Sequence, residues 1–256
     1  MVHRVLSLAA NTFRETVRNK ILYVILAFGL LVIALTWFLA DLSVGELSRL
    51  IVDVGLASIH LFGVTIAVFL GITLLSQEVE RKTIYLILSK PVPRREFVLG
   101  KAAGLGSTLF LTTSVMAAML FAVHAAYGGK PEPGIFLASA GIYMELVLLV
   151  LLATFFSAFT TPTLSAMFTL ALFLIGHLSG HLLVFGERSK AALPGLAASA
   201  VFYLLPNLEV FNWKNDVVYG QARSAGLLLG AGGYLLMYGA AILVLACLLF
   251  SRKDFK

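Results

Sequence analysis

Six apolar runs of about 20 residues recur along the chain, and polar residues gather in the stretches between them. A run of this length, folded as an α-helix, crosses the roughly 30 Å hydrocarbon core of a bilayer. The pattern therefore predicts an all-α polytopic membrane protein with a single transmembrane domain over residues 1–256. The six expected spans cover residues 21–40, 54–76, 102–126, 135–158, 163–184 and 227–250.

Residues 1–20, ahead of the first run, show helical periodicity with two unlike faces. The charges are interspersed and no cleavage site with small residues follows, so this segment is not a signal peptide. The pattern predicts an amphipathic helix that lies in the membrane interface before the first span. Its apolar face contains Val5, Ala9, Phe13 and Val17, and the opposite face contains Arg4, Asn11, Arg14, Glu15 and Arg18.

The composition agrees with this class, because only 12% of residues are charged and 60% are hydrophobic. Soluble domains contain about 25% charged residues. The net charge of +6 would suggest nucleic-acid binding in a soluble protein, but Lys and Arg beside membrane spans set the orientation instead. We therefore expect no nucleic-acid partner. The single cysteine, Cys247, excludes an intramolecular disulfide framework.

The distribution of Lys and Arg predicts which segments face the cytoplasm. With a cytoplasmic N-terminus, thirteen of the nineteen basic residues fall in inner segments and six in outer segments. This satisfies the positive-inside rule, so both termini are expected in the cytoplasm and the protein in the cytoplasmic membrane. The thirteen are Arg4, Arg14, Arg18, Lys20, Arg81, Lys82, Lys90, Arg94, Arg95, Lys101, Arg252, Lys253 and Lys256.

The outer segment 185–226 separates the fifth run from the sixth. Its apolar part, 191–206, has only sixteen residues and contains Pro194 and Pro206, which makes it short for a span. We expect a re-entrant or interfacial helix pair here, followed by an aromatic-belt segment with Phe211, Trp213 and Tyr219. A seventh span is the alternative, and it would place the C-terminus outside.

Glu145 is the only acidic residue well inside an expected span. A carboxylate at that depth costs several kcal/mol unless it is paired, hydrated or protonated, so it is a functional candidate. From the helical rise, Glu145 lies roughly 15 Å and His177 roughly 11 Å below the outer ends of their spans. We hypothesise that Glu145 lines a translocation path or pairs with His177. A structural, protonated or hydrogen-bonded Glu145 is the alternative.

His177 and His181 are four residues apart, which is also the spacing of a two-histidine metal site. Such a site needs further ligands, for which His60, His124 and Glu187 are the candidates. We expect ordinary hydrogen bonding between helices rather than a bound metal.

The chain also lacks the P-loop, H-E-x-x-H and G-x-S-x-G motifs, so we expect neither ATP bound by a P-loop of its own nor simple hydrolase chemistry.

Some glycines have the small-xxx-small spacing that permits close approach of membrane helices. The pairs with this spacing in apolar runs are Gly176/Gly180 and Gly226/Gly230. Because the chain contains 22 glycines, pairs of this kind also arise by chance. The sequence therefore indicates possible contact points between helices without assigning them.

The stretch 77–101 concentrates six of the nineteen Lys/Arg and three of the thirteen Asp/Glu between the second and third runs. Pro91 disfavours helical geometry at the residue before it, Lys90, and Pro93 can serve as the first residue of a new helix. The apolar run Ile84–Leu88 faces the cytosol by the charge count, and apolar surface on the water side favours a partner or the lipid surface. We expect a helix, a proline corner and a second helix that dock on a partner; a solvated loop that only sets topology is the alternative.

The residues of this stretch resemble a known family. Glu80, a basic–Thr pair at Lys82–Thr83, leucines, Pro91–Val92 and Gly100–Lys101 are similar to the first cytoplasmic loop of type-2 ABC exporter permeases, including those grouped with multicopper-enzyme maturation. Arg81–Lys82 replaces a frequent glycine. The resemblance extends to the amphipathic N-terminal helix, the six spans and the outer re-entrant segment.

The resemblance implies that this loop is the coupling helix of a transmembrane subunit in an ATP-driven exporter. It implies two copies of a separate ATP-binding subunit, which bind ATP and Mg²⁺, and a second permease copy or close homologue in the lipid membrane. The chain itself is then a permease without a cofactor or catalytic residues. The residues implied in ATPase coupling are Glu78, Glu80, Arg81, Lys82, Thr83, Tyr85, Leu86, Pro91, Arg94 and Arg95.

Other functions predict other sequence features. A secondary transporter or channel predicts inverted repeats and more intramembrane charge. A lipid-modifying enzyme predicts clustered polar groups at one interface; the stretch 207–221 is the only candidate for such a cluster, and it is a poor one. A non-transporting complex that transmits mechanical force shares the same sequence pattern. For an exporter, a narrow apolar path with one carboxylate suits lipids, lipid-linked glycans, amphipathic peptides or drugs.

Overall fold

The computed structural model describes residues 2–41, 47–80, 93–128, 132–188, 205–218 and 225–252, together with positions 195, 199 and 202. Within these ranges the chain forms eight α-helices, one 3-10 helix and no β-strand. The elements are α1 (Val2–Val17), α2 (Lys20–Asp41), α3 (Leu47–Glu80), α5 (Arg94–Ala126), α6 (Gly134–Ser157), α7 (Pro162–Arg188), η1 (Leu208–Phe211), α9 (Lys214–Val218) and α10 (Ala225–Arg252).

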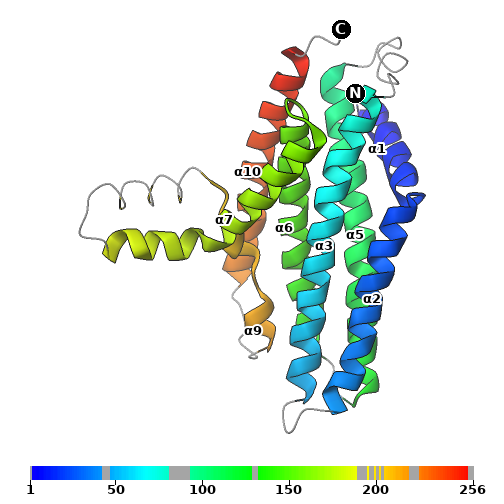
Figure 1. Ribbon diagram of the computed structural model, residues 1–256, viewed down its shortest axis with the longest axis vertical. Helices are drawn as coiled ribbons and strands as arrows, with labels where there is room; N and C mark the ends of the chain where they lie inside the picture. The colour runs from blue at the N-terminus through cyan, green and yellow to red at the C-terminus, as the bar shows by residue number, and fades with distance from the viewer. Residues whose placement is uncertain are drawn as a thin grey trace.

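Six of these helices, α2, α3, α5, α6, α7 and α10, are long and apolar enough to cross a membrane. This confirms the predicted class and the six predicted spans. Figure 1 shows α1, the C-terminal end of α3, the N-terminal end of α5 and the C-terminal end of α10 at one end of the bundle. The C-terminal ends of α2 and α5 and the N-terminal end of α3 lie at the opposite end (Figure 1).

The centre of the bundle is formed by α3 and α6. In their membrane-spanning windows, 72% and 67% of the residues are buried, against 22%, 22% and 17% for α2, α7 and α10. Packing explains the difference, because α3 contacts α2, α5, α6 and α7, whereas α10 contacts mainly α5 and α6. The peripheral helices therefore present apolar side chains to the surroundings of the chain, as residues facing lipid or another protein do.

Helix α1 packs along α5 through two glycines of α5 that stand four residues apart. A Cβ at Gly104 would lie 2.6 Å from the Ala9 carbonyl oxygen and 2.6 Å from the Thr12 Cβ. A Cβ at Gly100 would lie 2.5 Å from the Leu8 Cβ. The absence of side chains at these two positions is what lets the backbones approach, as in other small-xxx-small contacts.

The face of α1 that packs on α5 overlaps the predicted apolar face, since it includes the Val5 and Ala9 carbonyl groups, and it extends to the neighbouring threonines. Thr12 and Thr16 are buried, and the Thr16 hydroxyl donates to the Thr12 carbonyl within the helix. By contrast, Leu6 is 62% exposed. On the α5 side, Lys101 is buried and its Nζ lies 3.6 Å from a carboxylate oxygen of Glu15. The placement of α1 in a membrane interface stays a prediction.

Among the described residues, each glycine pair singled out in the sequence contains a glycine that no neighbouring helix contacts. A Cβ at Gly180 or Gly230 would meet no described atom within 4 Å. Gly176 does mark a close approach, but to the outer segment, since a Cβ there would lie 2.8 Å from the Pro206 carbonyl oxygen. The spacing occurs at all of these positions, and only the packing decides which glycines are contacted.

The described part of the outer segment, 205–218, is packed against the bundle. Phe211 and Trp213 are 0% and 2% exposed, and a Cβ at Gly141 of α6 would lie 2.6 Å from the Phe211 carbonyl oxygen and 2.9 Å from the Trp213 ring. The prediction that these two aromatics form an interfacial belt is therefore wrong, because they fill the space over Gly141. Tyr219 and most of 191–206 lie outside the described residues, so the re-entrant path and the alternative seventh span stay predictions.

Candidate functional site

Three ionisable side chains from three helices meet in the bundle: two imidazoles lie beside one carboxylate. Glu145 of α6 is 1% exposed, and its Oε1 lies 2.9 Å from Nε2 of His60 on α3. Nε2 of His177 on α7 lies 3.5 Å from the same oxygen. One nitrogen or oxygen atom from each residue lies within 4.8 Å of the other two. We call these three residues the His–Glu cluster.

Lys214 of α9 extends the His–Glu cluster toward the outer segment. Its Nζ lies 2.9 Å from Nδ1 of His60. Burial lowers the pKa of Lys214, while the carboxylates of Glu145, Glu209 and Asp53 act in the opposite direction. As an ammonium, Lys214 donates to Nδ1, so that His60 carries its proton on Nε2 and donates to Glu145. The buried carboxylate is then compensated through a bridging imidazole.

His177 is oriented by its own helix. Its Nδ1 lies 3.1 Å from the Phe173 carbonyl oxygen, and because a carbonyl only accepts, Nδ1 is the donor in this contact. In the neutral imidazole, Nε2 then carries a lone pair that is directed at Glu145. This nitrogen is buried and has no hydrogen-bond partner. Two electron-rich atoms therefore face each other across 3.5 Å.

The sequence predicted part of this arrangement. Glu145 and His177 lie together, as one of the two hypotheses required, while their role in a translocation path stays a prediction. His60, named in the sequence only as a possible metal ligand, is the nearer partner of Glu145. Lys214 was missed. His124 lies on α5 and is not one of the three clustered residues; the side chains of His181 and Glu187 are outside the described ones.

The predicted coupling region, residues 77–101, includes the end of α3 and the start of α5. Helix α3 continues to Glu80, and α5 begins at Arg94 with Pro93 as its N-cap, one position later than the predicted start at Pro93. Both Glu78 and Glu80 thus stand in the last turn of α3, and Arg95 is exposed in the first turn of α5. The segment 81–92 lies outside the described residues, and with it Arg81, Lys82, Thr83, Tyr85, Leu86 and Pro91.

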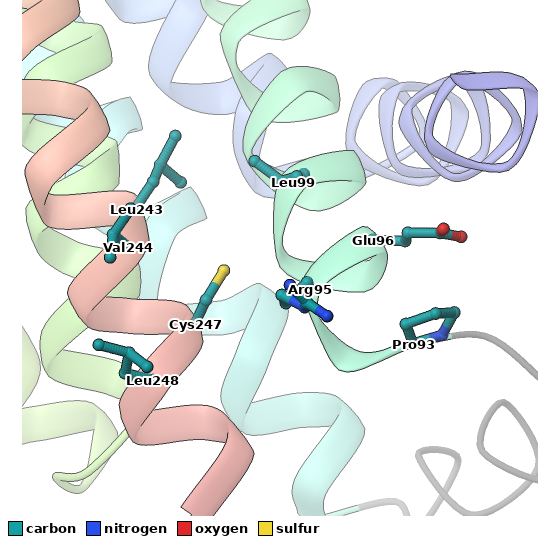
Figure 2. A pocket seen from close by; sticks show the side chains of 8 residues that line it. All are labelled: Pro93, Arg95, Glu96, Leu99, Leu243, Val244, Cys247 and Leu248. Carbon is teal, nitrogen blue, oxygen red and sulfur yellow. The ribbon is translucent and has the colours of Figure 1, made fainter. Parts of the chain in front are cut away.

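A cavity of about 700 Å³ separates the first turns of α5 from the last turns of α10 (Figure 2). Arg95 and Cys247 lie on the two sides of the cavity, whereas Glu96 points away from α10 (Figure 2). Beside the cavity, Phe97 and Val98 of α5 pack with Ala246 of α10 in one apolar cluster. The lining residues are Pro93, Arg95, Glu96, Leu99, Leu243, Val244, Cys247 and Leu248.

Comparison with known protein families supplies the identity. The family described as ABC-2 family transporter protein matches residues 6–255. The chain belongs to the ABC-2 transporter family. The protein is thus a permease, a multi-pass membrane component of ABC transport, as the resemblance of residues 77–101 implied. A comparison with curated proteins gave no match. Membership of the multicopper-enzyme-maturation group stays a prediction.

Family membership also bears on partners and chemistry. Permeases of the ABC-2 family associate in general with an ABC ATP-binding subunit and are generally not catalytic themselves. The His–Glu cluster therefore belongs to a transport component. Its position on α3, α6 and α7 places it where three membrane-spanning helices of the permease meet.

Replacing Lys214 by Met should lower the stability of the permease by about 2 kcal/mol, because it removes a hydrogen bond to a charged network and leaves Glu145 less compensated. We would measure thermal unfolding in detergent through Trp213, with Trp37 replaced by Phe so that Trp213 is the only emitter among the two tryptophans. Lys20→Met, at an exposed position of α2, is the control. Equal melting temperatures for both variants would contradict the prediction.

Proposed function

We propose that the permease is the transmembrane subunit of an ATP-driven exporter, in which segment 77–101 docks on a separate ATP-binding subunit. The observation that carries the proposal is the coupling-loop pattern of this segment in a chain of the ABC-2 family. Two ATP-binding subunits would bind ATP and Mg²⁺ and drive the change between inward- and outward-open states. The apolar run Ile84–Leu88 would supply most of the affinity, and the surrounding charges the orientation.

The proposed orientation places this loop and both termini in the cytoplasm. In support, α1, the joint between α3 and α5, and the end of α10 lie at the same end of the bundle (Figure 1). The segments at this end carry thirteen of the nineteen Lys/Arg residues. This is the distribution that the positive-inside rule predicts for the cytoplasmic side.

The two helices that flank the loop are suited to transmit its movement. Helices α3 and α5 have 34 and 33 residues, so each continues from the loop through the bundle as one unit. Helix α3 carries His60, and a displacement of the loop would therefore reach the His–Glu cluster. The cavity beside Arg95 and Cys247 would leave room for the start of α5 to shift. A flexible connection would instead absorb the movement.

The proposed assembly contains two permeases, identical or closely homologous, and the translocation path lies between them or within each. The apolar, largely exposed helices α2, α7 and α10 suit contacts with lipid and with the second permease. A complex that transmits force without transporting a substrate would use the same parts. Uptake or efflux by reconstituted vesicles separates the two functions.

Co-purification tests the proposed function. The permease would be expressed with its candidate ATP-binding subunit, extracted in mild detergent and purified through a tag on the permease. We expect a stable complex whose ATPase activity depends on the permease. The control is an ABC ATP-binding subunit from an unrelated transporter, which should not co-purify. If neither a complex nor permease-dependent ATPase activity is obtained, the proposal fails.

A further inference from the structure

We propose that the His–Glu cluster is a binding site for a divalent transition-metal ion of the zinc class. Two imidazoles and one carboxylate are a ligand set that zinc accepts, with three protein ligands and one open position. The ligands come from α3, α6 and α7 and are separated by 85 residues between His60 and Glu145 and by 32 between Glu145 and His177. The fold therefore brings them together, rather than local helical spacing.

The distances within the cluster agree with a metal site. In a tetrahedral site with metal–ligand bonds of about 2.0–2.1 Å, neighbouring ligand atoms lie about 3.3 Å apart. The two contacts of Glu145 Oε1, at 2.9 Å to His60 and 3.5 Å to His177, bracket this separation. All three ligand atoms lie within 4.8 Å of one another. A small movement of one imidazole then completes the triangle around an ion.

The tautomer of His177 favours a metal over a hydrogen bond. Metal-binding histidines commonly donate their second ring nitrogen to a backbone carbonyl, which fixes the ring and directs the lone pair at the ion. His177 has this arrangement, with Nδ1 on the Phe173 carbonyl and Nε2 buried without a hydrogen-bond partner. Nε2 of His177 lies 3.5 Å from Oε1 of Glu145, so both atoms are directed at the same point.

The surroundings account for the remaining charge. Glu145 supplies one negative charge at 1% exposure, and a bound cation would compensate it. Metal binding through Nε2 of His60 requires the ring proton to lie on Nδ1. Lys214 then accepts from Nδ1 as a neutral amine, so the one proton released to solvent comes from the Lys214 ammonium. Lys214 lies on the other ring nitrogen of His60, so it belongs to the shell around the site and not to the ligand set. This inference is independent of ATPase coupling.

Metal titration of the full-length permease tests the inference. The protein would carry a tag without histidines, be stripped with chelator, and be titrated with Zn²⁺, and separately with Co²⁺ as a spectroscopic probe. We expect one ion per chain and visible Co²⁺ bands of a four-coordinate site. We expect Zn²⁺ binding to weaken by about 100-fold or more in each of the variants His60→Gln, Glu145→Gln and His177→Gln. This loss is larger than the loss that follows when a residue hydrogen-bonded to a ligand, rather than the ligand itself, is replaced.

The control is His124→Gln, which changes a buried histidine of α5 outside the cluster and should leave Zn²⁺ binding unchanged. X-ray absorption of the zinc-loaded wild type should show two imidazole ligands, and this readout holds even where a variant fails to fold. Absence of stoichiometric binding, ligation without imidazole, or wild-type Zn²⁺ affinity in the three cluster variants would each overturn the inference. Loss of ATPase co-purification alone would leave it standing.

Discussion

Replacing Tyr85 and Leu86 together by Asp should abolish association with the ATP-binding subunit while the permease still inserts into the membrane. Both residues belong to the apolar run Ile84–Leu88, which is proposed to fill the docking surface of the partner. Apolar anchors at the centre of an interface carry most of its binding energy, and truncation of one typically costs 2 kcal/mol or more. Two buried carboxylates add a desolvation penalty without a partner.

The measurement is co-purification of the ATP-binding subunit with the variant, together with membrane extraction of the permease to establish insertion. The matched control is Tyr85→Phe with Leu86→Met, which keeps the size and apolar character of both side chains and should retain the complex. Survival of the complex in the aspartate variant would show that this run is not the docking element. Loss of insertion is not expected, because the six spans are unchanged.

Replacing Gly104 by Val should detach α1 from α5 and destabilise the permease by about 3 kcal/mol, at the upper end of the usual cost of overpacking. A side chain at this position meets the Ala9 carbonyl oxygen and the Thr12 Cβ, both at 2.6 Å from the added Cβ. Neither atom can rotate away, because one belongs to the backbone and the other is bonded directly to it. The two helices therefore have to separate.

Thermal unfolding and maleimide labelling of an introduced Ala9→Cys check this prediction. Cys247, the only native cysteine, would first be changed to Ser. We expect a lower melting temperature and faster labelling for Gly104→Val. Gly106→Ala on the same helix is the control: an added Cβ there lies 3.9 Å from its nearest described neighbour, the Tyr143 hydroxyl. It should gain up to about 1 kcal/mol from helix propensity. Wild-type behaviour of Gly104→Val would show that α1 does not depend on this contact.

The two sites differ in how far they could be predicted. The coupling region is continuous in sequence, so its charges, prolines and apolar run were visible together in residues 77–101. The His–Glu cluster is assembled from three helices. Its depth was partly visible, because the sequence placed Glu145 roughly 15 Å and His177 roughly 11 Å below the outer ends of their expected spans. Depth alone does not say which faces of the helices meet.

Lys214 shows the limit more clearly. It is the first residue of α9, which has only five residues and follows η1 closely, so no helical periodicity indicates the direction of its side chain. Its approach to His60 follows from the seating of Phe211 and Trp213 over Gly141. The same packing overturned the expected aromatic belt. Aromatic residues suit a membrane interface and a packed core alike, so their identity did not decide between the two.

The sequence by itself determined the class of the protein, the number of its spans and the family, because bilayer thickness requires long apolar helices and the 77–101 motif is local. Only the tertiary structure decided which glycines admit a neighbouring helix and which partners surround Glu145. Gly100 and Gly104 are in contact with α1, whereas an added Cβ at Gly180 on α7 or Gly230 on α10, which stand in pairs with the same spacing, would meet no described atom within 4 Å. Such choices depend on rotation and contact between helices, which the pattern of apolar residues along one helix does not contain.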